Sequence, residues 1–301
     1  MTELQRYLAE EVVEDHADGI ITRREAMRRL GLLGLGAAAA SALLSAPPAY
    51  ARGAAAHAHR RGHSSSDKGT VEQWAPVATE AITFPGPNGT LMGAWAPAAK
   101  PVGGVLVIHE NRGLVDHIRQ VAGRFAAAGF SALAIDLLSE EGGTAAIGDE
   151  AKVAAILAEV DPARFDAHMQ AGVTELARRL PHKRLATIGF CFGGGMVWRL
   201  LASGEDRLDA AAPFYGPFPA GGDLRGAKAA VLAIYGGLDA RVGMTRPEAE
   251  AALRAADLKH RVLIFTEADH AFFNDTGARF NAPAAAEAYR RTLDWFGRFA
   301  A

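Results

Sequence analysis

The 301-residue sequence predicts an α/β protein: a mostly parallel central sheet flanked by helices, with an antiparallel N-terminal hairpin. From Glu80 onward, short apolar runs bounded by turn residues alternate with helical stretches. Continuous apolar runs are typical of strands covered on both faces, and the alternation indicates right-handed parallel crossovers. The composition, with 50% hydrophobic and 22% charged residues, is that of a globular protein and argues against fibrous and disordered classes.

Residues 1–51 have the order of an export signal. A basic stretch with Arg23 and Arg24 precedes an apolar run from Leu30 to Leu44, and Ala49-Tyr50-Ala51 follows as an A-x-A cleavage site. The arginine pair and the weakly apolar run resemble a twin-arginine signal. The run is shorter than the ~20 residues that span a bilayer. We therefore predict export to the periplasm or the outside and no stable membrane span after processing; an uncleaved, membrane-associated N-terminus is the alternative.

Residues 52–78 are predicted to be a flexible tail, because the stretch from Arg52 to Thr70 contains too few apolar residues to pack. Three histidines in it, His57, His59 and His63, could chelate a metal, but no cysteine or carboxylate with ligand spacing joins them. A solvated tail is therefore favoured. Residues 79–301 are predicted to form the α/β domain.

The domain opens on a hairpin. Ala81–Phe84 and Thr90–Ala96 are joined through Asn88-Gly89, which supplies the positive-φ pair that a tight turn prefers. The core strands are predicted at 105–108, 130–135, 185–190, 210–214, 231–235 and 261–265. The helices are predicted at 119–128, 151–157, 164–180, 194–202, 247–256 and 284–299. The stretch 139–148 is predicted to be a long polar loop over a site.

The single cysteine, Cys191, lies between a predicted strand and a predicted helix, in the sequence Gly189-Phe190-Cys191-Phe192-Gly193-Gly194. This is the pattern of a nucleophile elbow with cysteine in place of serine. Small residues are needed beside the nucleophile because strand and helix close tightly there, and Gly189 and Gly193 supply them. The helix N-terminus favours a thiolate. A buried structural cysteine is the alternative.

An acid and a histidine follow in the chain order that elbow enzymes use, each after a strand. Asp239 follows the strand at 231–235, and His270 follows the strand at 261–265. Among the other acids, Asp136 precedes the nucleophile, and Asp269 adjoins the histidine and is expected to project away from it. The remaining histidines considered are interpreted as surface or packing residues: His168, His182 and His260.

Four segments carry a family resemblance: Val107–Leu114, Gly189–Gly194, Tyr235–Asp239 and His270–Asn274. Together they resemble the dienelactone hydrolase family of α/β-hydrolases, and the resemblance extends from Glu80 to the C-terminus. It implies an α/β-hydrolase fold. It also implies a catalytic triad of Cys191, His270 and Asp239, with Glu110 close to the thiol.

Glu110 is unusual beside a nucleophilic thiol, because its charge disfavours the thiolate and opposes the helix dipole. The resemblance implies that Glu110 contacts the thiol at rest and is displaced when substrate binds. An ion pair with Arg112 in a surface loop is the alternative. The backbone N–H groups of Asn111 and Phe192 are predicted to form the oxyanion hole.

These residues predict a hydrolase that cleaves an ester or lactone through a thioester acyl-enzyme. The expected partner is a small-molecule substrate, and a monomer is expected. The formal net charge of −2 gives no global reason to expect nucleic acid. No cofactor or metal is expected, because no H-E-x-x-H motif or cysteine cluster is present. A non-catalytic ligand-binding protein and a redox-sensing thiol remain alternatives.

One departure from the family limits the substrate. Members that cleave dienelactones are expected to hold the substrate carboxylate with an arginine after the triad histidine and another after the second core strand. Here Ala271–Asn274 and Asp136–Ser139 contain no arginine. Arg112 or Arg241 could substitute. Phe272 and Phe273 suggest an apolar pocket, or they belong to the core.

Overall fold

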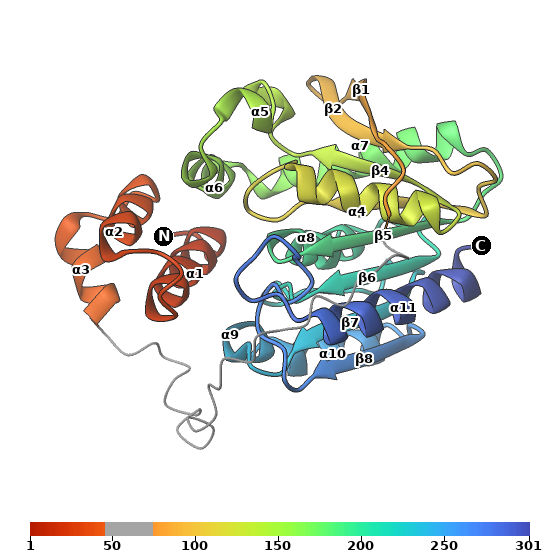
Figure 1. The fold of residues 1–301 in the computed structure, drawn as a ribbon. Helices are drawn as coiled ribbons and strands as arrows, with labels where there is room; N and C mark the ends of the chain where they lie inside the picture. Colours follow the sequence, from red (N-terminus) through yellow and green to blue (C-terminus); the bar gives the residue numbers. More distant parts are fainter. Residues whose placement is uncertain (46–74) are drawn as a thin grey trace. The chain divides into compact units, whose positions relative to one another are not determined.

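The computed structural model describes residues 1–45 and 75–301 (Figure 1). The predicted cleavage site at Ala49-Tyr50-Ala51, the tail histidines and most of the tail itself lie outside the described residues. The chain divides into two compact units. The first comprises the described part of Met1–Lys68 together with Ile147–Val160, and the second comprises the described part of Gly69–Ala146 together with Asp161–Ala301.

The first unit is helical. It contains α1 (Glu3–Ala17), α2 (Arg23–Leu32), α3 (Ala37–Ser45) and α6 (Glu150–Glu159). The apolar run of the predicted signal is divided, because α2 ends at Leu32 and Gly34 adopts a φ of 86° before α3 begins. Arg28 of α2 bonds Asp149, the N-cap of α6, at 3.0 Å. Of the helices described, none is long and apolar enough to cross a membrane.

The second unit is built on one sheet. Within the described residues it has eight strands in the order β1-β2-β4-β3-β5-β6-β7-β8. The strands are β1 (Glu80–Gly86), β2 (Gly89–Ala96), β3 (Gly103–Ile108), β4 (Phe130–Asp136), β5 (Leu185–Phe190), β6 (Ala210–Phe214), β7 (Ala230–Gly236) and β8 (His260–Phe265). Strand β2 pairs antiparallel with β1 and β4, and the other neighbouring pairs are parallel. The predicted fold class, with its antiparallel N-terminal hairpin, is confirmed.

Helices cover the sheet. The longer ones are α4 (Asp116–Ala127), α7 (Pro162–Arg179), α8 (Phe192–Ala202), α10 (Arg246–Ala255) and α11 (Ala282–Phe299). Helices α4 and α11 pack together, with the Tyr289 hydroxyl donating to the Arg124 carbonyl at 2.9 Å. Helices α7 and α8 also pack together, with Arg199 bonded to Asp166 at 2.6 Å. Strands β3, β4 and β5 are buried along their whole length, as their continuous apolar runs predict.

Two strand predictions need correction. In the hairpin, Gly86 pairs with Gly89, so Pro87 and Asn88 form the turn, and only Gly89 of the expected Asn-Gly pair has a positive φ. The run at 261–265 was expected to be covered on both faces. Strand β8 instead lies at the edge of the sheet and Ile264 is 44% exposed, because strand order is not visible in the run itself.

The stretch 139–148 is more structured than a polar loop. It contains a 3₁₀ turn, η3 (Ser139–Glu141), and a short helix, α5 (Thr144–Ile147). The Asp136 carboxylate accepts from the Thr144 backbone N–H at 2.8 Å and from its hydroxyl at 2.9 Å. Helix α4 also begins earlier than expected, at Asp116 rather than Arg119, and buries His117 and Ile118.

Candidate active site

Cys191 occupies a strained turn between β5 and α8. Its φ is 56° and its ψ is −120°, a conformation that non-glycine residues rarely adopt. The backbone N–H of Cys191 donates to the Phe214 carbonyl of β6 at 3.1 Å, and the residue is 2% exposed. The predicted strand-turn-helix setting of the cysteine is therefore present.

The glycines beside Cys191 are required by close backbone contacts. A Cβ atom on Gly189 would lie 2.1 Å from the Gly193 carbonyl oxygen. A Cβ atom on Gly193 would lie 2.4 Å from the carbonyl oxygen of Ile108 and 2.5 Å from that of His109. The elbow thus packs directly on the carboxyl end of β3, where the predicted oxyanion loop begins.

Asp239 and His270 meet at the carboxyl ends of β7 and β8. The Asp239 Oδ2 atom lies 2.6 Å from His270 Nδ1, and both side chains are 1% exposed. The other oxygen, Oδ1, accepts from the Val242 N–H at 3.0 Å, at the start of α9 (Ala240–Gly243). A ring nitrogen of His270 lies within 4.8 Å of Cys191 Sγ. The structure brings together the cysteine, histidine and aspartate that the sequence predicts.

The charges of this pair support one another. Burial alone would lower the pKa of His270, but the Asp239 carboxylate and the Cys191 sulfur raise it well above its usual value. Burial alone would raise the pKa of Asp239, yet the His270 charge and hydrogen bond, together with Arg241, lower it. The Asp239 carboxylate therefore orients the ring and stabilises the imidazolium that forms when His270 takes up a proton.

Glu110 follows β3 and is 4% exposed. Its Oε2 atom accepts from the Asn274 Nδ2 group at 2.7 Å. The Asn274 Oδ1 atom accepts from the backbone N–H of Thr276 at 3.0 Å and from its hydroxyl at 2.7 Å, which fixes the amide with its N–H group toward Glu110. The negative charges of Glu110 and Cys191 both raise the pKa of Tyr215.

The two predicted oxyanion donors lie on either side of His109. Asn111 belongs to the turn 110–113, closed by the Gly113 N–H donating to the Glu110 carbonyl at 3.1 Å. Phe192 is the first residue of α8, and its ring stacks on His109 with centroids 6.0 Å apart. The N–H of Phe192 lies at the positive end of the α8 dipole.

Tyr215 is a site residue that the sequence reasoning missed. It follows β6 with a φ of 35°, is fully buried, and packs edge-to-face on His270 with centroids 5.3 Å apart. Burial raises the pKa of Tyr215 well above its usual value, and Glu110 and Cys191 raise it further. Its position directly after an apolar strand was the available signal.

The other candidates have structural roles. Phe272 and Phe273 are fully buried and contact Tyr215 and Phe190 respectively, so they belong to the core and do not form the apolar pocket suggested by the sequence. The Asp269 carboxylate accepts from the His270 backbone N–H, at 2.7 Å, and not from the ring. The remaining histidines lie as predicted: His168 is buried and bonded to Glu140, His182 is exposed, and His260 opens β8.

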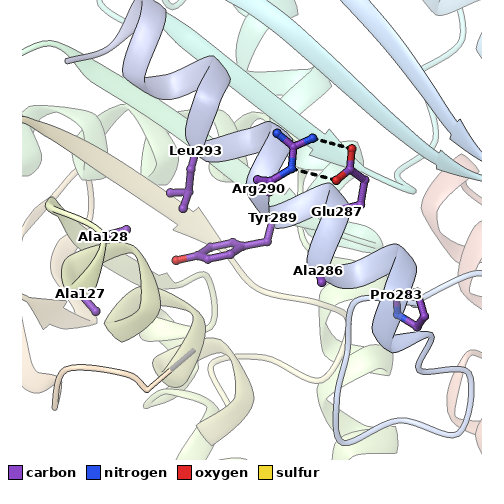
Figure 2. Close-up of a pocket in the computed structure, with 8 residues that line it drawn as sticks. All are labelled: Ala127, Ala128, Pro283, Ala286, Glu287, Tyr289, Arg290 and Leu293. Carbon is purple, nitrogen blue, oxygen red and sulfur yellow. Dashed lines mark hydrogen bonds and ion pairs between the residues drawn. The ribbon is translucent and has the colours of Figure 1, made fainter. Parts of the chain in front are cut away.

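A cavity of about 390 Å³ lies between α4 and α11 (Figure 2). It is lined by Ala127, Ala128, Pro283, Ala286, Glu287, Tyr289, Arg290 and Leu293. None of these is a candidate triad residue, and the paired Glu287 and Arg290 side chains at its rim satisfy each other at 2.7 Å. The cavity is therefore separate from the site built on Cys191.

Comparison with known proteins gives relatives over the same part of the chain. A protein of Escherichia coli O157:H7 named "Putative carboxymethylenebutenolidase" is 31% identical, over 66% of this chain and 78% of its own. A protein of the same name from Synechocystis is 30% identical, over 73% of this chain and 96% of its own.

Solved structures agree with the fold. The crystal structure named "Putative Dienelactone Hydrolase" from Klebsiella pneumoniae matches with a TM-score of 0.65 and 27% identity, covering 73% of this chain and 98% of its own. The model of the dienelactone hydrolase family matches residues 92–300, which include every candidate site residue. The chain therefore belongs to the dienelactone hydrolase family and is a hydrolase of the ester and lactone class.

Proposed function

We propose that the protein hydrolyses a small-molecule ester or lactone with Cys191 as nucleophile. The observation that carries the proposal is the convergence of three buried groups from three strand ends. Cys191 follows β5 on a strained elbow, Asp239 follows β7, and His270 follows β8 with its ring nitrogen bonded to Asp239 at 2.6 Å. Nucleophile, base and orienting acid are the parts that acyl transfer requires.

The first half of the reaction acylates the enzyme. His270 accepts the thiol proton, and the Cys191 sulfur attacks the substrate carbonyl carbon to form a tetrahedral oxyanion. The N–H groups of Asn111 and Phe192 donate to that oxyanion. The intermediate collapses to a thioester, and the leaving alkoxide takes the proton from His270. With a lactone the alkoxide remains attached, so acylation opens the ring.

The second half releases the acid. Water gives a proton to His270 and attacks the thioester carbonyl. The intermediate collapses with the thiolate as leaving group, and the thiolate takes the proton back from His270, which restores the thiol. Asp239 keeps the imidazole in one tautomer through both halves because its Oδ2 atom accepts from Nδ1. Glu110, anchored by Asn274, is proposed to disfavour the thiolate at rest and to be displaced by bound substrate.

A dienelactone carries a carboxylate, and the family is expected to bind it with arginines. This chain has no arginine at the matching positions. Arg241 is the more buried of the two alternatives, at 4% exposure, and it lies close enough to Asp239 to lower the pKa of that carboxyl. Its positive charge favours the ionised form of the Asp239 carboxylate. We propose a neutral ester or lactone as substrate, and a panel with and without a carboxylate on the acyl part tests this.

Hydrolysis of short aryl esters and lactones by the wild type and Cys191→Ala tests the nucleophile. We expect kcat/KM to fall by about 10³-fold or more in the variant, because removal of a triad nucleophile has effects of that size. Mass spectrometry of acid-quenched wild type should show one acyl group on Cys191. An active, folded Cys191→Ala enzyme would contradict the proposal.

A matched histidine pair tests the base. His270→Asn should lose activity to a similar degree, because the ring that accepts the proton is gone. His182→Asn should keep wild-type activity, since His182 is exposed and its φ of 64° is one that asparagine tolerates. If His270→Asn were as active as wild type and His182→Asn, His270 would not be the base.

A further inference from the structure

His109 forms a link between two neighbouring strand ends. It follows β3 directly, and its ring is fully buried. On one side Nδ1 lies 2.6 Å from the Glu110 carbonyl oxygen. On the other side the backbone N–H of Leu137, just after β4, donates to Nε2 at 3.2 Å. The ring therefore joins the ends of two parallel strands through one hydrogen bond at each nitrogen.

These contacts fix the tautomer of His109. The Leu137 group is a backbone N–H and can only donate, so Nε2 must present a lone pair. Nδ1 then carries the hydrogen and donates to the Glu110 carbonyl. Burial lowers the pKa of His109, while Asp136 and the carbonyl contacts act in the opposite direction. A neutral ring with hydrogen on Nδ1 satisfies both partners.

The Glu110 carbonyl is held from two directions. It accepts from His109 Nδ1 at 2.6 Å and from the Gly113 N–H at 3.1 Å. The peptide that joins Glu110 to Asn111 is planar and trans, so its N–H points opposite to its carbonyl. Fixing the direction of the carbonyl therefore fixes the direction of the Asn111 N–H.

His109 also contacts the second donor residue. Its ring stacks on Phe192 with centroids 6.0 Å apart and planes at 23°. Its own carbonyl oxygen faces Gly193, where a Cβ atom would lie 2.5 Å away. His109 thus bonds the Glu110 carbonyl through its ring and contacts the ring of Phe192, the residue that supplies the second proposed donor.

We propose that His109 is a positioning residue for the oxyanion hole: its Nδ1–H bond to the Glu110 carbonyl turns the Asn111 N–H toward the substrate oxygen. This inference rests on the proposed acyl transfer at Cys191. An N–H donor contributes fully only when it is aimed at the oxyanion before the reaction begins. His109 sets the direction of the Asn111 N–H without itself touching the substrate.

Two isosteric substitutions separate the two bonds of the ring. In His109→Asn the amide nitrogen takes the place of Nδ1, so the bond to the Glu110 carbonyl is kept and that to Leu137 is lost. In His109→Gln the amide oxygen takes the place of Nε2, so the bond to Leu137 is kept and that to the Glu110 carbonyl is lost. Both variants lose one hydrogen bond and stacking with Phe192, so their midpoints of unfolding should fall by similar amounts.

Their kcat values should differ. His109→Gln should lose about 10- to 100-fold in kcat with little change in KM, because only transition-state stabilisation is affected. His109→Asn should lose several-fold less. The inference is overturned if the loss of kcat in both variants is proportional to the loss of stability. It is also overturned if the kcat of His109→Gln equals that of His109→Asn.

Two reactions of the same thiol give a second readout. An aryl trifluoromethyl ketone adds to Cys191 and forms an oxyanion, whereas alkylation by iodoacetamide forms none. His109→Gln should weaken the ketone about 10-fold or more and leave the alkylation rate within a few-fold of wild type. Equal effects on both reactions mean that the variant alters the thiol itself, and the inference fails.

Two controls complete the test. Cys191→Ala assayed in parallel separates the two ideas: if it remains active the proposed function fails, and if it is inactive while His109→Gln is fully active only the positioning role fails. If His109→Gln does not fold, ¹⁵N NMR of wild-type His109 decides. Hydrogen on Nδ1 is required, and hydrogen on Nε2 or on both nitrogens overturns the inference.

Discussion

At the scale of single residues, Asn274 determines how Glu110 is held. It donates to Glu110 Oε2 at 2.7 Å, and its own oxygen is fixed by Thr276. Asn274→Leu approximately keeps the side-chain volume but removes the amide donor. The buried Glu110 Oε2 atom then loses its hydrogen bond from Asn274. We expect the free energy of unfolding to fall by about 1.5–3 kcal/mol, the range for a hydrogen bond to a charged group. Urea unfolding monitored by circular dichroism measures this.

A double-mutant cycle tests whether this loss of unfolding free energy arises from the contact between Asn274 and Glu110. In a Glu110→Gln background the carboxylate charge is absent, so Asn274→Leu should cost measurably less than in wild type. Thr276→Val removes one of the two donors to the Asn274 oxygen and should cost about 1 kcal/mol. An equal cost of Asn274→Leu in both backgrounds would show that the asparagine does not act through Glu110.

At the scale of elements, Asp275 ties the loop that carries His270 to helix α4. Its carboxylate contacts His117 Nδ1 at 3.0 Å and also binds Arg124. Burial alone would raise the pKa of Asp275, but these partners lower it from 3.8 to about 2. A carboxylate with a depressed pKa stabilises the fold above its unfolded pKa, and that contribution is lost as pH falls from about 4 to about 2.

Asp275→Asn should therefore flatten the pH dependence of stability. Thermal unfolding of wild type should show a midpoint that falls between pH 4 and pH 2, and part of that fall should be absent in the variant. At pH 7 the variant should be less stable and less active, because the loop with His270 loses its link to α4. Asp257→Asn is the control, since Asp257 is exposed and its φ of 51° suits asparagine. The same slope in Asp275→Asn and wild type contradicts the assignment.

At the scale of the whole molecule, we propose that residues 1–51 direct export of the catalytic domain. The arginine pair lies at the start of α2, and Arg23 donates to the Ser41 hydroxyl of α3 at 2.8 Å. Replacing Arg23 and Arg24 by lysine conserves charge and helix propensity and removes the arginine pair that a twin-arginine signal requires. In a host with that export system, the variant should accumulate in the cytoplasm and the wild type in the exported fraction. Fractionation with an antibody against the domain measures this.

Activity is the control for the export test. The purified lysine variant should hydrolyse esters at the wild-type rate, because the substitutions lie outside the proposed catalytic groups. N-terminal sequencing of exported wild type then locates the cleavage site, predicted after Ala51. Wild-type distribution of the lysine variant would contradict a twin-arginine route.

The sequence allowed the core strands to be predicted, and it allowed the three residues of the proposed triad to be placed at strand ends, because both depend on local signals. A strand such as Leu185–Phe190 is one apolar run, and Cys191, Asp239 and His270 each follow such a run. The exposed face of β8 was missed because strand order is a property of the assembled sheet. The burial of Phe272 in an aromatic core was missed for a related reason, since its partners come from separate segments.

The contacts that position Glu110 and its backbone, made by Asn274 and His109, could not be predicted from the sequence. His109 stood within a recognised segment, but its role depends on the Leu137 N–H, which another strand brings to it. The sequence shows only that Asn274 stands where an arginine is expected, whereas its bond to Glu110 depends on the fold that brings the two loops together. Residue types at strand ends can be read from sequence, while their partners across the sheet require the fold.

The single cysteine at the elbow makes it possible to count active sites. Cys191 is the single cysteine of the chain and is 2% exposed. A thiol reagent in denaturant therefore counts every molecule once, and an acylating titrant under native conditions counts only competent sites. The ratio of the two gives the active fraction of any preparation, so turnover numbers can be compared between variants without assuming equal quality.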